Sequence, residues 1–232
     1  VCDHLVAPES AGLFRAAIMQ SGPCSAQAAL PAAERISIDY ASKAGCRNAA
    51  AARACLLALP ADRLQGGPIY FRIGTSDLSG PVTGTRRLPV APPTVAARGP
   101  IARVPVLIGS TADEFTLFVA LSYLRDHRLK PYPVLLADSF GVQAAAVAAQ
   151  YPLNRYDGSV GLAYAAAVTD GLFACPTETL TADLAERAPV YAYEFSDRHA
   201  PAPEPLRHTP FAPGAGHALE LRYLLDVGGA PA

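Results

Sequence analysis

The chain has 232 residues, of which 51% are hydrophobic and 17% are charged, with a formal net charge of −1. This composition supplies enough apolar surface for a large folded core and differs from the polar composition of disordered chains. The near-neutral charge, with no basic patch, excludes the usual nucleic-acid-binding surface. No uninterrupted apolar run has the length of a membrane span.

Five cysteines occur in the chain, and no pair of them has the C-x-x-C spacing of a zinc site. The sequence therefore predicts no metal and no cofactor. Because the number of cysteines is odd, they cannot all pair within the chain. From the residues alone, we interpret them as buried free thiols, which pack like small apolar side chains.

The spacing of apolar residues predicts helices alternating with three strands. In chain order we expect a helix end at 1–6, a turn at 7–12, a strand at 16–20, helices at 31–44 and 48–59, and a helical turn from Pro60. Residues 66–100 are rich in glycine and proline, which predicts a long loop. Beyond it we expect a strand at 104–109, helices at 112–124 and 133–149, one or two helices within 163–187 interrupted near Pro176, a strand at 190–195, a proline-rich loop at 198–213 and a helix from 217.

The three predicted strands are largely apolar on both faces, as strands of a buried parallel sheet are. Their alternation with helices predicts an α/β fold with a mostly parallel sheet flanked by helices. Three such strands are few for this many helices. We therefore expect residues 1–232 to form a single incomplete domain, with insertions around 29–100 and further strands before Val1.

Two segments carry candidate catalytic side chains. Asp113 and Glu114 follow the strand at 104–109, and catalytic groups of open α/β sheets gather at that edge. His217 follows the small residues 214–216, and acid before histidine is the chain order of α/β-hydrolases after their serine. From the pattern alone two other interpretations stay open: a solvated helix start for the acids, and a surface or capping role for the histidine.

Ser10 lies in the segment Pro-Glu-Ser-Ala-Gly, which is close to the nucleophile motif G-x-S-x-G. That motif needs a strand before the serine and a helix after it. Here the predicted order is reversed, with a helix before Ser10 and a strand after it. We therefore predict that Ser10 is a turn residue.

At residues 1–22 the chain resembles the type-B carboxylesterase and lipase family, within the α/β-hydrolases. The resemblance rests on Val-Cys-Asp-His-Leu at 1–5 and on Gly-Leu-Phe-Arg-Ala-Ala-Ile-Met-Gln-Ser-Gly at 12–22, which are similar to the segment after the family's serine elbow. It continues in residues 104–114, similar to V-P-x-x-x-G-x-x-x-D-E, and in 217–221, similar to H-x-x-E-L. The match covers almost the whole chain, and it places the nucleophile about half a dozen residues upstream of Val1.

The resemblance implies roles for particular residues. Glu114, not Asp113, is the triad acid, and His217 is the triad base. Phe115 replaces the family's usual glycine. Ser21 is expected to hydrogen-bond behind the acid, and the alternative is that it only satisfies the end of a strand.

Further expectations concern the cysteines and the substrate pocket. Cys46 and Cys55 match a pair that is disulfide-bonded in several relatives, with two thiols in a reducing compartment as the alternative. Cytoplasmic and secreted locations both stay open. Tyr70, Phe71 and the loop 74–100 are expected to border the acyl or alcohol pocket.

The activity implied by the resemblance is hydrolysis of small carboxylic esters through an acyl-enzyme, without a cofactor. Because the serine is expected upstream of Val1, residues 1–232 alone are predicted to be inactive. The alternative is an esterase-like interaction domain of the adhesion type that has lost its serine.

Overall fold

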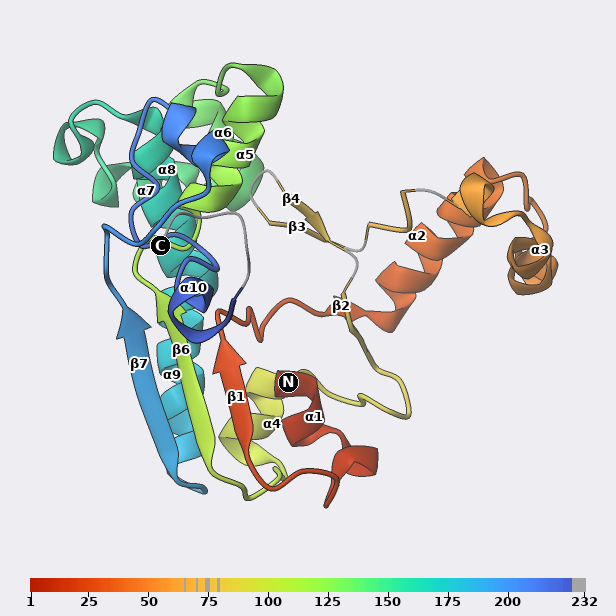
Figure 1. The fold of residues 1–232 in the computed structure, drawn as a ribbon. Coiled ribbons are helices and arrows are strands. Elements are labelled where there is room, and N and C mark those ends of the chain that lie inside the picture. Colours follow the sequence, from red (N-terminus) through yellow and green to blue (C-terminus); the bar gives the residue numbers. More distant parts are fainter. Residues whose placement is uncertain (65, 70, 74–75, 79, 227–232) are drawn as a thin grey trace.

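A three-stranded parallel sheet forms the centre of the chain (Figure 1). The computed structural model describes residues 1–226 except 65, 70, 74, 75 and 79, and for 71–73 and 76–78 it describes the backbone alone. The sheet has the order β1 (Ala17–Gln20), β6 (Val106–Thr111) and β7 (Val190–Phe195). This arrangement confirms the predicted α/β fold, with a mostly parallel sheet flanked by helices.

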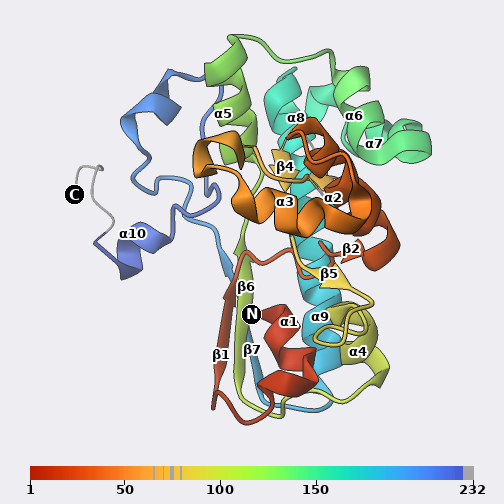
Figure 2. The same ribbon diagram turned by 90° about the vertical axis from the view of Figure 1, so that its right-hand side faces the viewer.

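Helices α1 (Cys2–Val6), α4 (Pro92–Arg98) and α9 (Cys175–Ala185) lie together on one face of this sheet (Figure 2). Between them and the strands is an apolar core that includes Met19, Val106, Ile108, Leu180 and Leu184. Removal of this apolar surface from water stabilises the layered arrangement.

The other face of the sheet carries exposed apolar side chains. Ile18 is 57% exposed, Leu107 is 38% exposed and Tyr191 is 65% exposed. The strand register places these three residues side by side across the sheet. Within the described residues, these strands are therefore buried on one face only. Successive side chains point to opposite faces, and only one face lies under α1, α4 and α9.

A second core lies beyond the carboxyl ends of the strands, among α5 (Thr116–Asp126), α6 (Tyr132–Phe140), α7 (Ala144–Gln150) and α8 (Val160–Val168). Phe115 and Tyr164 are fully buried there. The single helix expected at 133–149 is divided. Gly141 has a φ of 53°, which ends α6 before the short 3-10 turn η4 (Gly141–Gln143).

One continuous helical stretch runs through α8, the π-helical turn η6 (Thr169–Ala174) and α9. The interruption expected near Pro176 does not occur. Proline is tolerated in the first turn of a helix, where its missing N–H removes no bond, and Pro176 occupies that position in α9. The wider turn before it carries the change of register: the N–H of Cys175 bonds Asp170 O, five residues back.

The segment 66–100 contains more regular structure than the loop expected there. It includes the hairpin strands β3 (Phe71–Ile73) and β4 (Ser76–Leu78), β5 (Val82–Thr83), which pairs with β2 (Ala28–Ala29), and helix α4. Two prolines begin α4, and a proline-rich segment can therefore start a helix as well as form a loop.

An arm of helices projects away from the sheet (Figure 1). It consists of α2 (Leu30–Lys43), η2 (Ala49–Ala51), α3 (Ala52–Ala58) and η3 (Ala61–Leu64). Asn48 caps the second helical segment as predicted, because its side chain accepts the N–H of Ala50 at 3.0 Å.

Short helical turns complete the described chain: η1 (Pro8–Ser10), η5 (Leu153–Tyr156), η7 (Glu204–His208) and α10 (Leu221–Leu224). The helix expected from residue 217 is shorter than predicted and begins only at Leu221. Ala218 has a φ of 66°, and this left-handed conformation does not continue a helix.

Disulfides join Cys2 to Cys24 and Cys46 to Cys55, and Cys175 is a free, exposed thiol. The first bridge corrects the interpretation of Cys2 and Cys24 as free thiols. It ties α1 to the loop that follows β1. The second bridge lies within the helical arm.

Two helical stretches, 132–150 and 160–185, have the length and mean hydropathy of a membrane span, 1.3 and 1.2 respectively. Length and composition alone are weak grounds, because core helices of folded proteins share them. Both stretches contribute buried side chains to the second core, including Leu136 and Tyr164. Neither is a clear membrane span.

Candidate active site

The turn between β6 and α5 holds the candidate acid. The helix expected from 112 begins only at Thr116, so residues 112–115 are free to form this turn. The side chain of Glu114 is completely buried, and its Oε1 accepts the N–H of Thr111 at 2.7 Å. A buried carboxylate is tolerated only where its oxygens are paired, and the turn supplies the first partner.

His217 supplies the second partner. Its Nδ1 lies 2.6 Å from Glu114 Oε2, although the two residues are 103 positions apart in sequence. The backbone N–H of His217 also donates to Glu114 O at 3.3 Å. Because the carboxylate accepts, Nδ1 carries the proton and Nε2 keeps its lone pair. The side chain of His217 is 29% exposed, whereas that of Glu114 is completely buried.

Two aromatic rings flank this imidazole. The ring centroid of Phe118, from α5, lies 5.1 Å from that of His217 at an interplanar angle of 45°. The ring of Phe173, from η6, lies at 5.8 Å and 52°. The base is therefore enclosed by apolar side chains on the side of the second core.

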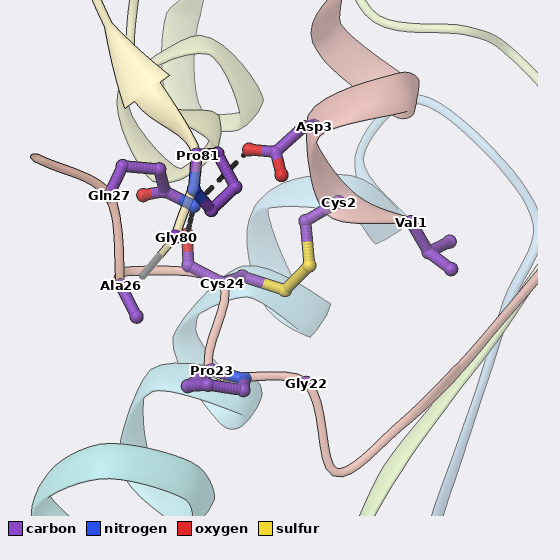
Figure 3. Close-up of a pocket in the computed structure, with 10 residues that line it drawn as sticks. All are labelled: Val1, Cys2, Asp3, Gly22, Pro23, Cys24, Ala26, Gln27, Gly80 and Pro81. Carbon is purple, nitrogen blue, oxygen red and sulfur yellow. Dashed lines mark hydrogen bonds between the residues drawn. A yellow bond between two sulfur atoms is a disulfide. The ribbon is translucent and has the colours of Figure 1, made fainter. Parts of the chain in front are cut away.

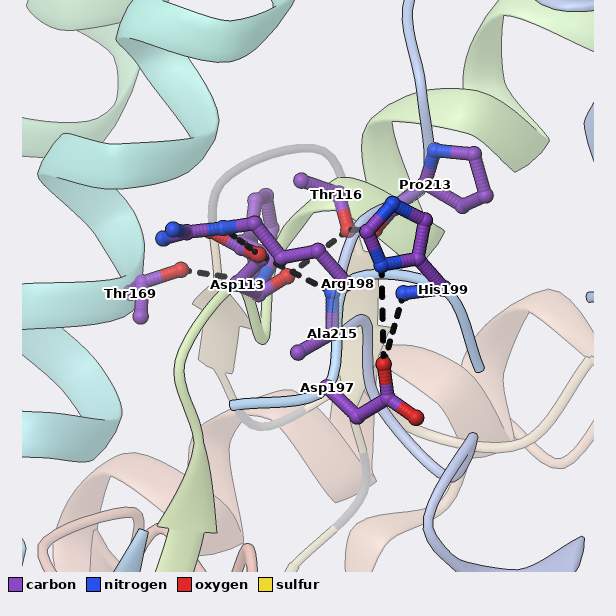
Figure 4. A network of polar contacts seen from close by, with 9 residues as sticks. Asp113, Thr116, Thr169, Asp197, Arg198, His199, Pro213 and Ala215 are labelled. Atoms are coloured by element: carbon purple, nitrogen blue, oxygen red, sulfur yellow. Dashed lines mark hydrogen bonds and ion pairs between the residues drawn. The ribbon is translucent and has the colours of Figure 1, made fainter. Parts of the chain in front are cut away.

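Asp113, beside the acid, clamps the loop that carries the base (Figure 4). Its Oδ2 accepts the N–H of Ala215 at 2.9 Å, and its own N–H donates to Ala215 O at 3.0 Å. Arg198 donates to both carboxylate oxygens, at 2.9 and 3.3 Å. Hydrogen bonding to Asp113 raises the pKa of Arg198 further above its ordinary value. The two neighbouring acids thus have different partners: Glu114 bonds the imidazole of His217, and Asp113 bonds the backbone of Ala215, two residues before it.

The small residues before His217 are required by close packing. Gly214 has a φ of 58°, and a Cβ there would collide with the carboxylate of Asp113. A Cβ on Gly216 would lie 2.8 Å from Thr116 Oγ1. That hydroxyl bonds the same loop, at 2.6 Å from Pro213 O. The loop therefore packs closely against Asp113 and Thr116, which follow β6.

Ser21 does not form the hydrogen bond that was expected behind the acid. It ends β1 with a φ of 52°, and its N–H donates to Gly109 O at 2.9 Å. Its Oγ is buried without a hydrogen-bond partner among the described residues. Both oxygens of Glu114 are already occupied by Thr111 and His217. In this structure Ser21 satisfies the strand end, as in the alternative stated for it.

Glu220, one turn after the base, is also buried, and its Oε2 has no hydrogen-bond partner in the described part of the chain. Burial raises the pKa of this carboxyl above its ordinary value, and the charge of Glu114 raises it further. Desolvation and a neighbouring like charge both disfavour the ionised form.

Ser10 lies in the 3-10 turn η1, and its Oγ is 2.9 Å from His4 Nδ1. The structure does not bring it to His217. The turn precedes β1, whereas His217 contacts Glu114 in the turn that follows β6.

A cavity of about 270 Å³ lies beside the start of α1 (Figure 3). Its walls are mostly apolar, and they include Val1, Pro23, Pro81 and the Cys2–Cys24 bridge. Gln27 braces the walls, since its Nε2 donates to Cys24 O at 2.8 Å and to Asp3 Oδ1 at 3.3 Å. Gly80 and Pro81 belong to the loop 74–100 that was expected near a pocket. Tyr70 and the side chain of Phe71 lie outside the described residues.

Sequence reasoning did not identify the clamp residues, the flanking Phe173 or the Cys2–Cys24 bridge. Residues 214–216 did signal a close backbone approach, but not which side chain makes it. The family resemblance includes residues 173–177, but it gives Phe173 no role, and a buried aromatic residue on a helix is usually an ordinary core residue.

Two comparisons with known proteins both identify esterases. A model of the carboxylesterase family matches residues 1–231. Among solved structures, the chain is similar to a PNB esterase, with a TM-score of 0.68 and 26% sequence identity. The match covers 96% of this chain and 45% of the esterase chain. The fold is that of an α/β-hydrolase, and the chain spans less than half the length of that esterase.

Proposed function

The chain belongs to the carboxylesterase family, and from this premise we propose that Glu114 and His217 are the acid and base of a Ser-Glu-His triad that hydrolyses carboxylic esters. One observation carries the proposal. A fully buried carboxylate bonds Nδ1 of an imidazole at 2.6 Å, and the histidine side chain is 29% exposed. This is the arrangement in which a carboxylate fixes the tautomer of a general base.

In the proposed reaction, a serine Oγ attacks the ester carbonyl while His217 Nε2 takes its proton. The imidazolium then protonates the departing alkoxide, which leaves an acyl-enzyme. Water, activated by the same nitrogen, attacks the acyl group and releases the acid. Throughout the cycle, the charge of Glu114 stabilises the imidazolium.

The serine is proposed to lie on the segment upstream of Val1, where the family resemblance places it. Among the described residues, no serine bonds the imidazole of His217. We therefore propose that residues 1–232, expressed alone, do not hydrolyse esters. Acylation also needs oxyanion donors, one of which is the backbone N–H after the serine.

The cavity beside Val1 is proposed to receive the acyl group. A serine about half a dozen residues upstream of Val1 lies within roughly 20 Å of the cavity even along an extended backbone. The apolar walls favour an alkyl chain over a charged group. The volume, about 270 Å³, is large enough for a short acyl chain such as butyrate.

A fluorophosphonate probe tests the proposal independently of the natural substrate, because it labels only an activated serine. We expect covalent labelling of the protein expressed from its complete gene, on a serine before Val1, and loss of labelling in His217→Ala. A complete protein without such a serine would instead be an interaction domain of the esterase type. Equal labelling of both proteins would remove His217 from the mechanism.

A further inference from the structure

We propose that the π-helical turn η6 positions both catalytic groups, through Thr169 for the acid and Phe173 for the base. The inference rests on the proposed function of Glu114 and His217 and adds two positioning residues to it. Neither residue touches the reacting atoms. Each acts through the group that it contacts.

Thr169 holds the turn of the acid. Its Oγ1 accepts the N–H of Phe115 at 3.0 Å, and both residues are buried. Phe115 directly follows Glu114, so this bond fixes the backbone from which the carboxylate projects. A buried N–H without an acceptor is costly. Loss of this hydroxyl would leave the N–H of Phe115 without its acceptor.

Phe173 contacts the base. Its ring is 3% exposed and lies 5.8 Å from the imidazole, while Phe118 lies on it at 5.1 Å. Rings on two separate elements restrict the rotation of the imidazole about its own side chain. The Nδ1 hydrogen bond alone would let the imidazole rotate about the line from Nδ1 to Oε2. The rings of Phe118 and Phe173 restrict this rotation.

The spacing of the two residues explains how one turn reaches both groups. Thr169 is the first residue of the turn and Phe173 lies four residues later, and the contacts of both side chains show that they reach the site. The turn itself is anchored at its back. Tyr151 Oη donates to Asp170 Oδ2 at 2.6 Å, and the pKa of Tyr151 is raised by burial and by this bond.

A hydroxyl deletion in the complete protein tests the first contact. Thr169→Val keeps the side-chain shape and removes the acceptor, and Thr169→Ser restores the hydroxyl. We expect the valine variant to lose roughly 10- to 100-fold in kcat with KM for p-nitrophenyl butyrate nearly unchanged, and the serine variant to recover most of the loss. Thr181→Val is the matched control, because the Thr181 hydroxyl bonds only the helix carbonyl of Thr177.

Phe173→Leu tests the second contact by keeping apolar volume while it removes the ring. We expect a fall in kcat of similar size, whereas Phe14→Leu, in the other core, leaves kcat unchanged. Thermal unfolding of each variant confirms that it is folded. If both site variants keep the kcat of the wild type while His217→Ala abolishes hydrolysis, the inference is wrong and the proposed function stands. If the wild type itself does not hydrolyse esters, both are wrong.

Discussion

At the scale of single residues, neighbouring carboxylates take different roles because their surroundings differ. Glu114 points into the protein, where a backbone N–H and an imidazole are its partners. Asp113 points toward Arg198, whose side chain is 66% exposed, and toward the N–H of Ala215. The two carboxylates are chemically alike, and their different positions in the turn give them different partners.

Substitution of each acid by its amide separates these roles. Glu114→Gln removes the charge that stabilises the imidazolium, so we expect kcat to fall roughly 10²- to 10⁴-fold in the complete protein. Asp113→Asn keeps one acceptor oxygen but weakens the clamp. We expect it to lower the free energy of unfolding by about 1–2 kcal/mol with a much smaller loss in kcat. Steady-state kinetics and urea unfolding measure both, and equal kinetic losses would contradict the assignment of Glu114 as the acid.

The raised pKa of Glu220 predicts a pH dependence of stability. A carboxyl with a folded-state pKa above its ordinary value of 4.5 stabilises the fold fully below that value, and the contribution is lost as pH rises through the folded-state pKa. Glu220→Gln cannot ionise. We expect its melting temperature to exceed that of the wild type at pH 7 by more than at pH 4.

The exposed Glu194→Gln is the control for that experiment, and its difference from the wild type should not vary with pH in this way. A difference between Glu220→Gln and the wild type that is constant from pH 4 to pH 7 would show that Glu220 does not titrate as a buried group.

The contact between Glu114 and His217 could be anticipated from sequence, because the family resemblance selects these two residues from two short motifs in a fixed order. The side chains that hold the pair could not. Asp113, Thr169 and Phe173 act through contacts between residues far apart in the chain, and no local pattern encodes such contacts. Ser21 shows the converse: the resemblance named it as a partner for the acid, but its hydroxyl has no hydrogen-bond partner among the described residues.

At the scale of elements, the strands of the central sheet were predictable because apolar, β-branched segments such as 104–109 stand out against polar turns. Two helical features were not. The prolines at the start of α4 read as a loop signal although they occupy a first helical turn. Pro176 predicted an interruption, but it lies in the first turn of α9, where the helical stretch continues from the π-helical turn η6.

Removal of each disulfide is expected to affect a different part of the chain. In the chain-entropy model, each bridge raises stability by about 3 kcal/mol for loops of these sizes. Cys2→Ala/Cys24→Ala frees α1 from the loop after β1 and opens a wall of the cavity. We therefore expect both a lower melting temperature and faster hydrolysis of longer p-nitrophenyl esters relative to the butyrate.

Cys46→Ala/Cys55→Ala is the matched control for this pair. We expect faster proteolysis of the helical arm, between α2 and α3, with an unchanged preference for acyl length. A change in acyl-length preference in the arm variant but not in the Cys2→Ala/Cys24→Ala variant would contradict the assignment of the cavity.

At the scale of the whole molecule, the sheet is covered on one side only within the described residues. The row of Ile18, Leu107 and Tyr191 is apolar and exposed, and exposed patches of this kind promote association. The fold class followed from the alternation of strands and helices. A continuous apolar strand has the same sequence pattern whether one face or both are packed, so the pattern alone did not say which face is uncovered.

This row predicts the behaviour of residues 1–232 expressed alone. We expect the chain to self-associate, and Tyr191→Lys to increase the monomer fraction in sedimentation velocity, because a charge in the row opposes apolar contact. Val142→Lys is the control: Val142 is 98% exposed but stands apart from the row. A monomeric wild-type chain, or an equal effect of both substitutions, would show that the row does not drive association.

The central claim is that Glu114 and His217 form the acid–base pair of an ester hydrolase. The most direct test is the rate of p-nitrophenyl butyrate hydrolysis by the complete protein, beside its His217→Ala variant at equal folded concentration. We expect measurable turnover by the wild type and a loss of roughly 10³- to 10⁶-fold in kcat for the variant. An unchanged rate in the variant, or no hydrolysis by a folded wild type, would contradict the claim.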